Sequence, residues 1–207
     1  MQAEAMFLHQ EDGMRVAFIH TKGGVGKTTS ALMVATAAAA EGEKVTVYDA
    51  DPQGSATRWA EVAEQRGEQL PFAVTFVTAE QITALPRQED GLQIIDTPPG
   101  NAESIQSAID TADLIVIPSG ASPMDIDRVW PTLDTVTGRP AGVLLTGVLM
   151  HTKFYTEARQ LLEDQGVPTF YNAIPQREEI KASFGTAPTR LHGYDDVYRE
   201  IVEIEEM

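Results

Sequence analysis

Short apolar runs alternate with longer helix-like stretches along the chain from Met14 onward. Apolar runs of about four to eight residues between helices are typical of parallel strands that are buried on both faces of a sheet. The runs predict strands over residues 16–19, 44–48, 72–77, 92–95, 113–117 and 143–150, with a short one at 169–171. The stretches between them predict helices over residues 28–40, 55–65, 102–109, 125–136, 155–165 and 194–205. Pro118 should end the fifth strand, and Pro131 should kink or delay the helix that contains it.

This alternation indicates an α/β protein with a doubly wound, mostly parallel sheet. The 207 residues suit one domain, which we place at residues 14–207 behind an N-terminal extension of residues 1–13. In open α/β sheets, ligands bind beyond the carboxyl ends of the strands. The residues that directly follow each predicted strand are therefore the ones to inspect for chemistry.

The composition excludes several classes of protein. The chain has no cysteine, which rules out disulfides, thiol catalysis, zinc–thiolate sites and iron–sulfur clusters. Its 31 acidic and 15 basic residues give a net charge of −16, which opposes nucleic-acid binding unless a local basic patch exists. No apolar run approaches the ~18 residues of a membrane span, and the acidic N-terminus lacks the features of a secretory signal. We therefore expect a cytoplasmic protein.

A glycine-rich loop follows the first predicted strand. Its residues are Thr21, Lys22, Gly23, Gly24, Val25, Gly26, Lys27, Thr28 and Thr29. The pattern Gly-x-x-x-x-Gly-Lys-Ser/Thr marks a phosphate-binding loop, and here Thr21 stands in place of the first glycine. Glycines let successive N–H groups point at phosphate oxygens, and the following helix adds its positive end. We predict that Lys27 reaches the β- and γ-phosphates of a nucleotide and that the Thr28 hydroxyl binds Mg²⁺.

Lys22 is a second cation beside the glycines. Its own site already has Lys27, so Lys22 is free to reach across a dimer interface to a phosphate bound by a partner, as an arginine finger does. The alternative is an ordinary solvated surface lysine. Its position next to the glycines favours the role across the interface.

Two aspartates follow predicted strands and offer oxygen ligands. Asp51 is placed to orient a water that attacks the γ-phosphate, and Asp96 is placed to bind Mg²⁺ through water. We place the metal at Thr28, Asp51 and Asp96. The alternative for both acids is a structural cap on the turn that follows each strand. Asp49 stays ambiguous between a supporting contact to Mg²⁺ or Lys27 and a simple end to its strand.

The glycine-rich loop resembles the deviant Walker A box of the ParA/MinD family of P-loop ATPases. Further segments that resemble the family follow later strands, and together with the loop they are residues 22–28, 49–55, 94–100, 117–118 and 122–125. The matches run from about Met14 to Arg177, which is most of the chain. By its length the chain is most similar to the short, ParF-type partition proteins. The resemblance implies a P-loop NTPase fold with ATP and Mg²⁺ as cofactors.

The resemblance also implies a cycle and partners. ATP draws two subunits into a homodimer with both nucleotides at the interface, and the dimer then binds non-specific DNA or a membrane. A ParB-like, centromere-binding partner stimulates hydrolysis of ATP to ADP and phosphate. Such a protein segregates plasmid or chromosomal DNA, or positions a large cargo, and associates with the nucleoid when its dimer binds DNA.

Membrane binding in this family needs a basic amphipathic tail. Residues 195–207 hold six acids and one arginine, which an anionic leaflet would repel. We therefore expect no membrane contact, and we expect the stripe Val197, Ile201 and Ile204 to face the core.

For DNA, residues 151–199 hold six bases and seven acids, so a basic patch competes with a mixed solvated surface. The candidate bases are Lys153, Arg159, Arg177, Lys181, Arg190 and Arg199. For the adenine, the stretch 174–177 resembles the family's segment near the base, which carries over Pro175. Residues 149–152, which we take as the end of the sixth strand, lack the asparagine that many relatives use there.

Two other classes of function stay open. A P-loop ligase or kinase of related fold would phosphorylate or activate a small molecule, but it needs an acceptor pocket for which the sequence offers no segment. A nucleotide-gated binding module would bind ATP with negligible turnover. Product analysis and a turnover assay separate these classes from a ParA-type ATPase.

Overall fold

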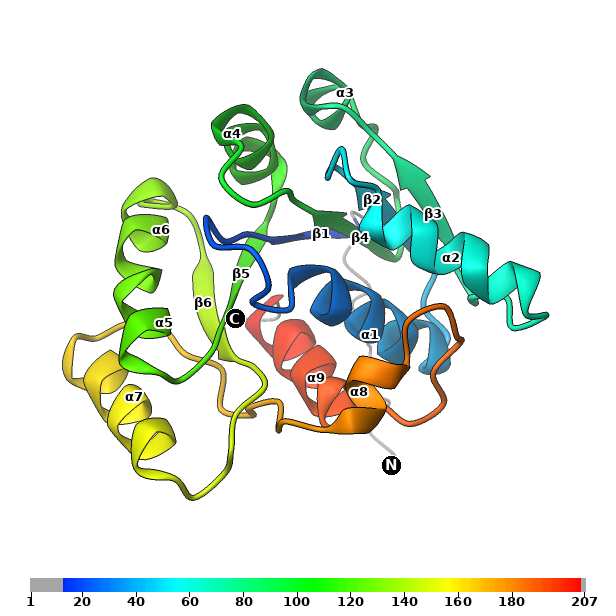
Figure 1. The fold of residues 1–207 in the computed structure, drawn as a ribbon. Coiled ribbons are helices and arrows are strands. Elements are labelled where there is room, and N and C mark those ends of the chain that lie inside the picture. The colour runs from blue at the N-terminus through cyan, green and yellow to red at the C-terminus, as the bar shows by residue number, and fades with distance from the viewer. Residues whose placement is uncertain (1–12, 206–207) are drawn as a thin grey trace, which may run out of the picture.

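The computed structural model describes residues 13–205, so the predicted N-terminal extension lies outside them except for Gly13. Within these residues one sheet has the strand order β3-β2-β4-β1-β5-β6 (Figure 1). Its strands are β1 (Met14–Phe18), β2 (Val45–Asp49), β3 (Ala73–Phe76), β4 (Leu92–Asp96), β5 (Leu114–Ser119) and β6 (Ala141–Leu145). Every pairing between them is parallel, which confirms the predicted doubly wound α/β class.

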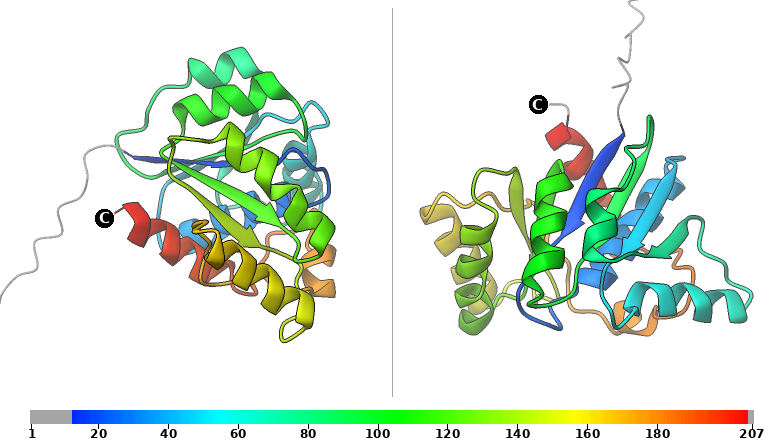
Figure 2. Two further views of the ribbon diagram at one scale, coloured as in Figure 1. Left: turned by 90° about the vertical axis from the view of Figure 1, so that its left-hand side faces the viewer. Right: turned by 90° about the horizontal axis from the view of Figure 1, so that it is seen from above.

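Helices cover both faces of this sheet. In Figure 2, α3 and α4 lie on one side of the strands, and α1 and α9 lie on the other. The helices are α1 (Lys27–Ala40), α2 (Ser55–Gln65), α3 (Ala79–Thr83), α4 (Ala102–Thr111), α5 (Pro123–Asp127), α6 (Val129–Thr135), α7 (Lys153–Asp164), α8 (Glu178–Ala182) and α9 (Tyr194–Glu205). Because successive side chains of a strand point to opposite faces, Val16 and Phe18 join the core under α1 and α9, while Ala17 joins the core under α4. This explains why the strands are apolar throughout.

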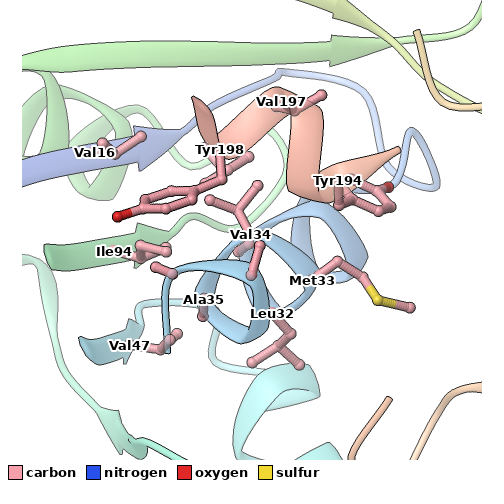
Figure 3. Packing of buried hydrophobic residues seen from close by; sticks show 14 of the residues in the cluster. Val16, Leu32, Met33, Val34, Ala35, Val47, Ile94, Tyr194, Val197 and Tyr198 are labelled. Carbon is pink, nitrogen blue, oxygen red and sulfur yellow. The ribbon is translucent and has the colours of Figure 1, made fainter. Parts of the chain in front are cut away.

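Helix α9 packs on α1, although the two helices are far apart in sequence. Figure 3 shows Tyr198 of α9 beside Val34 of α1, with its ring near Val16 and Ile94 of the sheet. Val197 and Ile201 are fully buried, which confirms the predicted core-facing stripe for these two residues. Ile204 is 42% exposed, so the stripe ends one turn earlier than predicted. No helix among residues 13–205 is long and apolar enough to cross a membrane.

Two predicted strand ends are wrong. Strand β5 continues through Pro118 to Ser119. The main-chain nitrogen of Pro118 faces the β1 side of the strand, where the pairing between β5 and β1 has already stopped at Val116. A proline there costs no ladder hydrogen bond. Strand β6 ends at Leu145 and not at residue 150, since the chain turns at Gly147 with a φ of 61°. The predicted short strand at 169–171 is only an isolated bridge between Thr169 and Val143.

The helix predictions fail where the elements are short. The predicted helix 125–136 is two helices that meet at Arg128, because Pro131 has no N–H to donate to the carbonyl of Asp127. Pro131 instead lies in the first turn of α6, where a proline is tolerated. Helices α3 and α8 were not predicted, and each has five residues, too few for a helical periodicity to show.

The register of the central strands determines which polar residues meet. Asp96, the last residue of β4, is paired with Phe18 of β1 on one side and with Asp49 of β2 on the other. The glycine-rich loop therefore leaves β1 directly beside the two aspartates. The carboxyl edge of β1, β4 and β2 is the place where the predicted chemistry gathers.

Candidate nucleotide-binding site

The loop between β1 and α1 has the geometry of a phosphate cradle. Gly24 and Gly26 adopt φ angles of 76° and 91°, a left-handed conformation that favours glycine. Gly26 is the N-cap of α1, and no side chain caps this helix, whereas Asn101 and Thr152 cap α4 and α7. The first turn of α1 also holds no acid. Its N–H groups and its positive end are therefore available to an anion.

A cavity of about 310 Å³ opens beside this loop. Of the predicted nucleotide-binding residues, those that line it are Lys22, Gly24, Val25, Gly26, Thr29 and Pro175. Two cations, Arg177 and Lys181, lie in its wall together with Tyr194, whose buried hydroxyl is hydrogen-bonded to Ser30 of α1. The remaining predicted residues, Gly23, Lys27, Thr28, Asp51 and Asp96, do not line the cavity. The site thus has an open cavity and a separate, more buried group around Lys27.

Lys27 and Asp96 form the buried part of the site. Burial is the main cause that lowers the pKa of Lys27, and the charges of Asp96 and Asp51 oppose it, so the three groups are near one another. Asp96 is completely buried, and within the described residues 13–205 neither of its carboxylate oxygens has a hydrogen-bond partner. Burial raises the pKa of Asp96 to about 7, and the charge of Asp49 adds to this rise. The Thr28 hydroxyl and the charge of Lys27 act against the rise, although the hydroxyl makes no hydrogen bond of normal geometry to the carboxylate.

Such an orphaned carboxylate fits a divalent cation. A buried charge without a partner destabilises the protein, and Mg²⁺ with its waters would supply the missing partner. Among residues 13–205, no three His, Asp or Glu residues cluster into a cage that could hold a metal alone. Mg²⁺ commonly takes only one or two protein ligands and completes its shell with phosphates and water. Thr28 and Asp96 fit this pattern.

Asp49 has a structural role that the sequence left open. Its side chain is fully buried and accepts hydrogen bonds from the N–H of Asp51 at 3.1 Å and from the N–H and hydroxyl of Thr57, both at 2.8 Å. It therefore ties the loop after β2 to the first turn of α2. Asp51 lies on this loop, half-buried, and accepts from the N–H of Gln53. Asp49 is thus the residue that fixes where Asp51 points.

Lys22 is held in its own subunit by a residue that the sequence did not single out. Its ammonium donates to Asp125 at the start of α5, at 2.5 Å, and the lysine side chain is 37% exposed. Burial acts to raise the pKa of Asp125, but the hydrogen bonds from Lys22 and Ser122 lower it below its ordinary value on balance. The Nζ of Lys27 also rests 3.4 Å from the carbonyl oxygen of Lys22. Lys22 therefore lies at the mouth of the cavity with its charge neutralised by Asp125.

The residue after β6 differs from the one we inspected in the sequence. Because the strand ends at Leu145, the position beside the loop is Thr146 and not residues 149–152. The Thr146 hydroxyl donates to the carbonyl oxygen of Val25 at 2.9 Å. Thr146 thus supports the glycine-rich loop. The signal that could have found it is the Thr-Gly pair that interrupts the apolar run after Leu145.

Thr146→Val removes this support while keeping the shape of the side chain. We expect the Kd of a non-hydrolysable ATP analogue to rise by up to about tenfold, because a buried hydrogen bond contributes about 1 kcal/mol. Titration of the analogue with Mg²⁺ measures the change. Thr137→Val, in the exposed turn that follows α6, serves as the control. Equal affinity of both variants would show that Thr146 does not shape the loop.

The basic residues proposed for DNA do not form one free patch. Four of the six bind other groups of this chain. These are Lys153 with Glu157, Arg159 with the carbonyls of Phe170 and Tyr171, Lys181 with Glu178, and Arg199 with Glu41 and Asp196. Arg177 and Arg190 both lie near Glu179 of α8, whose pKa is lowered mainly by a backbone hydrogen bond and to a smaller extent by these two charges. The cluster around α8, next to the cavity, is therefore the strongest concentration of positive charge among these six.

Comparison with known proteins identifies the family to which the chain belongs. Residues 16–187 match the family described as the CobQ/CobB/MinD/ParA nucleotide binding domain. The maintenance of carboxysome distribution protein A of Gloeobacter kilaueensis is 36% identical over 163 residues, which cover 75% of this chain and 73% of the relative. The chromosome-partitioning ATPase Soj of Thermus thermophilus is 28% identical over 91% of this chain and 95% of its own length.

Solved structures share the fold at lower identity. The complex of Cyanothece McdA(D38A) with ATP has a TM-score of 0.72 at 18% identity, and the match covers 95% of this chain and 96% of that one. Cobyrinic acid a,c-diamide synthase of Mycobacterium smegmatis, crystallised with ADP and magnesium, has a TM-score of 0.70 at 16% identity over 94% and 96% of the two chains. The family match covers the glycine-rich loop, the aspartates and all residues that line the cavity except Tyr194. The chain belongs to the ParA/MinD family of P-loop nucleotide-binding proteins.

Proposed function

We propose that this protein is an ATP-dependent, dimerising ATPase that partitions DNA or positions a large cargo. The observation that carries the proposal is the placement of Lys22. Lys22 lines the cavity with its ammonium paired to Asp125 and its side chain 37% exposed, whereas Lys27 is buried. A cation in that position serves a phosphate better in a facing subunit than in its own, which is the logic of an arginine finger.

Each residue of the site has a separate task in this proposal. The loop amides and Lys27 bind the phosphates of ATP, and Thr28 and Asp96 hold Mg²⁺, which neutralises charge on the β- and γ-phosphates when bound. Asp51, fixed by Asp49, orients the attacking water. Lys22 of each subunit stabilises the charge that develops at the other subunit's γ-phosphate. Pro175 and the cavity wall contain the adenine and ribose.

The cellular role rests on the relatives. One is named for the distribution of carboxysomes and another for chromosome partitioning. In the cycle that we propose, ATP forms the dimer, DNA retains the dimer, and a ParB-like partner bound to the cargo or centromere stimulates hydrolysis and releases it. The cargo is plasmid or chromosomal DNA, or another large assembly.

The ATP-bound dimer should bind non-specific DNA through two copies of the basic cluster at α8. The attraction of one copy to the DNA phosphates is opposed by the net negative charge of the chain, so two copies are needed. With two to four phosphate contacts, we expect affinity to fall by about tenfold or more between 50 and 200 mM salt. Retardation of a random duplex, with ATP analogue or ADP present, measures this. Arg190→Ala should weaken retention, and the control Lys44→Ala, at an exposed site on a different part of the surface, should not. Equal retention with ADP and with the analogue would contradict an ATP-gated contact.

The experiment that tests the proposed function has two arms. The oligomeric state is measured by light scattering with ADP and with a non-hydrolysable analogue plus Mg²⁺, and a dimer is expected only with the analogue. Release of phosphate from ATP is then measured without any acceptor, and turnover is expected at high protein concentration. Phosphate release that needs a small-molecule acceptor would favour the ligase or kinase instead. A monomer with bound analogue would contradict the proposal.

A further inference from the structure

His20 is a buried histidine that the proposed mechanism does not use. It lies between β1 and the glycine-rich loop and is fully shielded from solvent. Its Nδ1 accepts the main-chain N–H of Lys22 at 2.9 Å. Because Nδ1 is the acceptor, the neutral ring carries its proton on Nε2, and Nε2 has no partner among residues 13–205.

Burial and two neighbouring cations both disfavour a charged ring at this position. Burial is the largest cause that lowers the pKa of His20 to about 4, and the ammonium groups of Lys27 and Lys22 act in the same direction, opposed by Asp125. The ring is therefore neutral at physiological pH, and Nδ1 stays able to accept. A buried N–H without a partner destabilises a fold, so packing alone does not explain a histidine here.

Three contacts hold Lys22 in the nucleotide-free subunit. Asp125 binds its ammonium, Lys27 contacts its carbonyl oxygen, and His20 binds its amide. Under the proposed function, the first two contacts must break. Lys27 moves to the phosphates of its own nucleotide, and the ammonium of Lys22 leaves Asp125 for the nucleotide of the partner subunit. The contact from His20 competes with neither movement.

We propose that His20 is a positioning residue for Lys22: its Nδ1 fixes the lysine's main chain so that the side chain can leave Asp125 and still reach the second subunit's phosphate. This inference rests on the proposed function, because it assigns His20 a role only if Lys22 acts across the dimer. A residue that acts in this way affects the chemical step more than the binding of nucleotide, since the loop amides and Lys27 bind the phosphates without it.

Three substitutions at position 20 distinguish the role of Nδ1 from that of Nε2. In His20→Asn, the side-chain oxygen occupies about the place of Nδ1 and can accept from Lys22. In His20→Gln, the oxygen lies near the place of Nε2, and His20→Leu offers no acceptor. The Asn and Gln variants are both polar and differ by one methylene, so their comparison holds even if the Leu variant does not fold. Thermal melting of each variant checks the fold.

The measurements are kcat and KM for ATP with Mg²⁺, and the dimer fraction with a non-hydrolysable analogue. We expect Gln and Leu to lower kcat by about tenfold with KM changed less than about threefold, which is the effect of one lost hydrogen bond in the transition state. We expect Asn to restore kcat to within about threefold of wild type. An Asn variant as slow as Gln, or a KM that rises as much as kcat falls, would overturn the inference.

Failure of the proposed function gives a different result. If wild type and Lys22→Ala turn over ATP equally, Lys22 has no role across the dimer, and both the proposed function and this inference are wrong. If Lys22→Ala is inactive while His20→Leu and His20→Gln match wild type, the proposed function stands and the inference about His20 alone is overturned.

Discussion

Lys22→Ala will lower ATP turnover by at least about a hundredfold and change the affinity of one subunit for Mg·ATP by less than about threefold, because a finger residue acts on the transition state. The buried group that we propose to bind phosphate and metal contains Lys27 and Asp96 and does not include the Lys22 side chain. Removing Lys22 therefore leaves that group intact. Steady-state phosphate release and titration of a fluorescent analogue measure the two quantities.

A mixing experiment shows whether Lys22 acts in its own subunit or in the other one. Lys22→Ala keeps Asp51, and Asp51→Ala keeps Lys22, so each homodimer is inactive for a different reason. In a mixed dimer, the Lys22→Ala subunit has an intact Asp51 and receives Lys22 from its partner. Equal mixing should then restore about a quarter of wild-type turnover, since half of the dimers are mixed and each has one complete site. No recovery on mixing would mean that Lys22 acts within its own subunit.

Two controls address a purely structural role for Lys22. Lys44 forms an exposed ion pair with Asp90, so Lys44→Ala should leave turnover unchanged. Asp125→Asn keeps a side-chain oxygen that accepts from the N–H of Ser122 in the cap of α5 but weakens the pair with Lys22. If the pair itself were needed for activity, this variant would lose turnover as Lys22→Ala does. We expect it instead to dimerise at a lower concentration of analogue, because Lys22 is released more easily.

The sequence predicted the site well where its chemistry is local. The strand, the glycines, Lys27 and Thr28 lie within one short segment, and the structure places them at the carboxyl edge of β1 as expected. The paired ends of β4 and β2 could also be foreseen, because parallel strands end on the same edge. Local pattern and fold rule agree at this edge, which is why the prediction succeeds there.

Contacts between distant residues could not be predicted in this way. Asp125 is 103 positions from Lys22, and Thr146 is 121 positions from Val25, so no spacing rule joins them. The end of β6 was misjudged because Val148, Leu149 and Met150 continue the apolar run, yet Leu149 and Met150 are exposed in the loop. An apolar residue alone does not show which surface it faces.

The buried carboxylate of Asp96 makes the nucleotide-free protein sensitive to pH. Its pKa is raised from 3.8 to about 7 in the folded protein, with burial as the main cause. The folded state therefore binds this proton more tightly than the unfolded state does. Below about pH 4, Asp96 costs the folded protein no stability. As the pH rises from about 4 to about 7, ionisation of Asp96 lowers the free energy of unfolding, and above pH 7 it lowers it no further.

Asp96→Asn removes this penalty and removes the metal site together. At pH 8 we expect the variant without nucleotide to be more stable than wild type by on the order of 3 to 5 kcal/mol, since each pKa unit corresponds to about 1.4 kcal/mol. Near pH 5 the advantage should shrink to about 1.5 to 2 kcal/mol of the free energy of unfolding, because Asp96 is then protonated in the folded protein while the same carboxyl is largely ionised in the unfolded chain. Urea unfolding at both values of pH measures the difference. Asp134→Asn, at an exposed carboxyl, is the control and should show no such dependence.

The same variant should lose the benefit of Mg·ATP. In wild type, Mg²⁺ gives the orphaned oxygens of Asp96 a partner, so Mg·ATP stabilises the protein beyond the effect of nucleotide alone. In Asp96→Asn, addition of Mg²⁺ to the nucleotide-bound protein should change the unfolding midpoint little, and turnover should fall by at least about a hundredfold. A variant that is no more stable than wild type at pH 8, or one that still responds fully to Mg²⁺, would show that Asp96 is not the strained carboxylate that holds the metal. Under the proposed function, stability given up in the empty state is thus the physical reason for metal and nucleotide to bind together at this edge of the sheet.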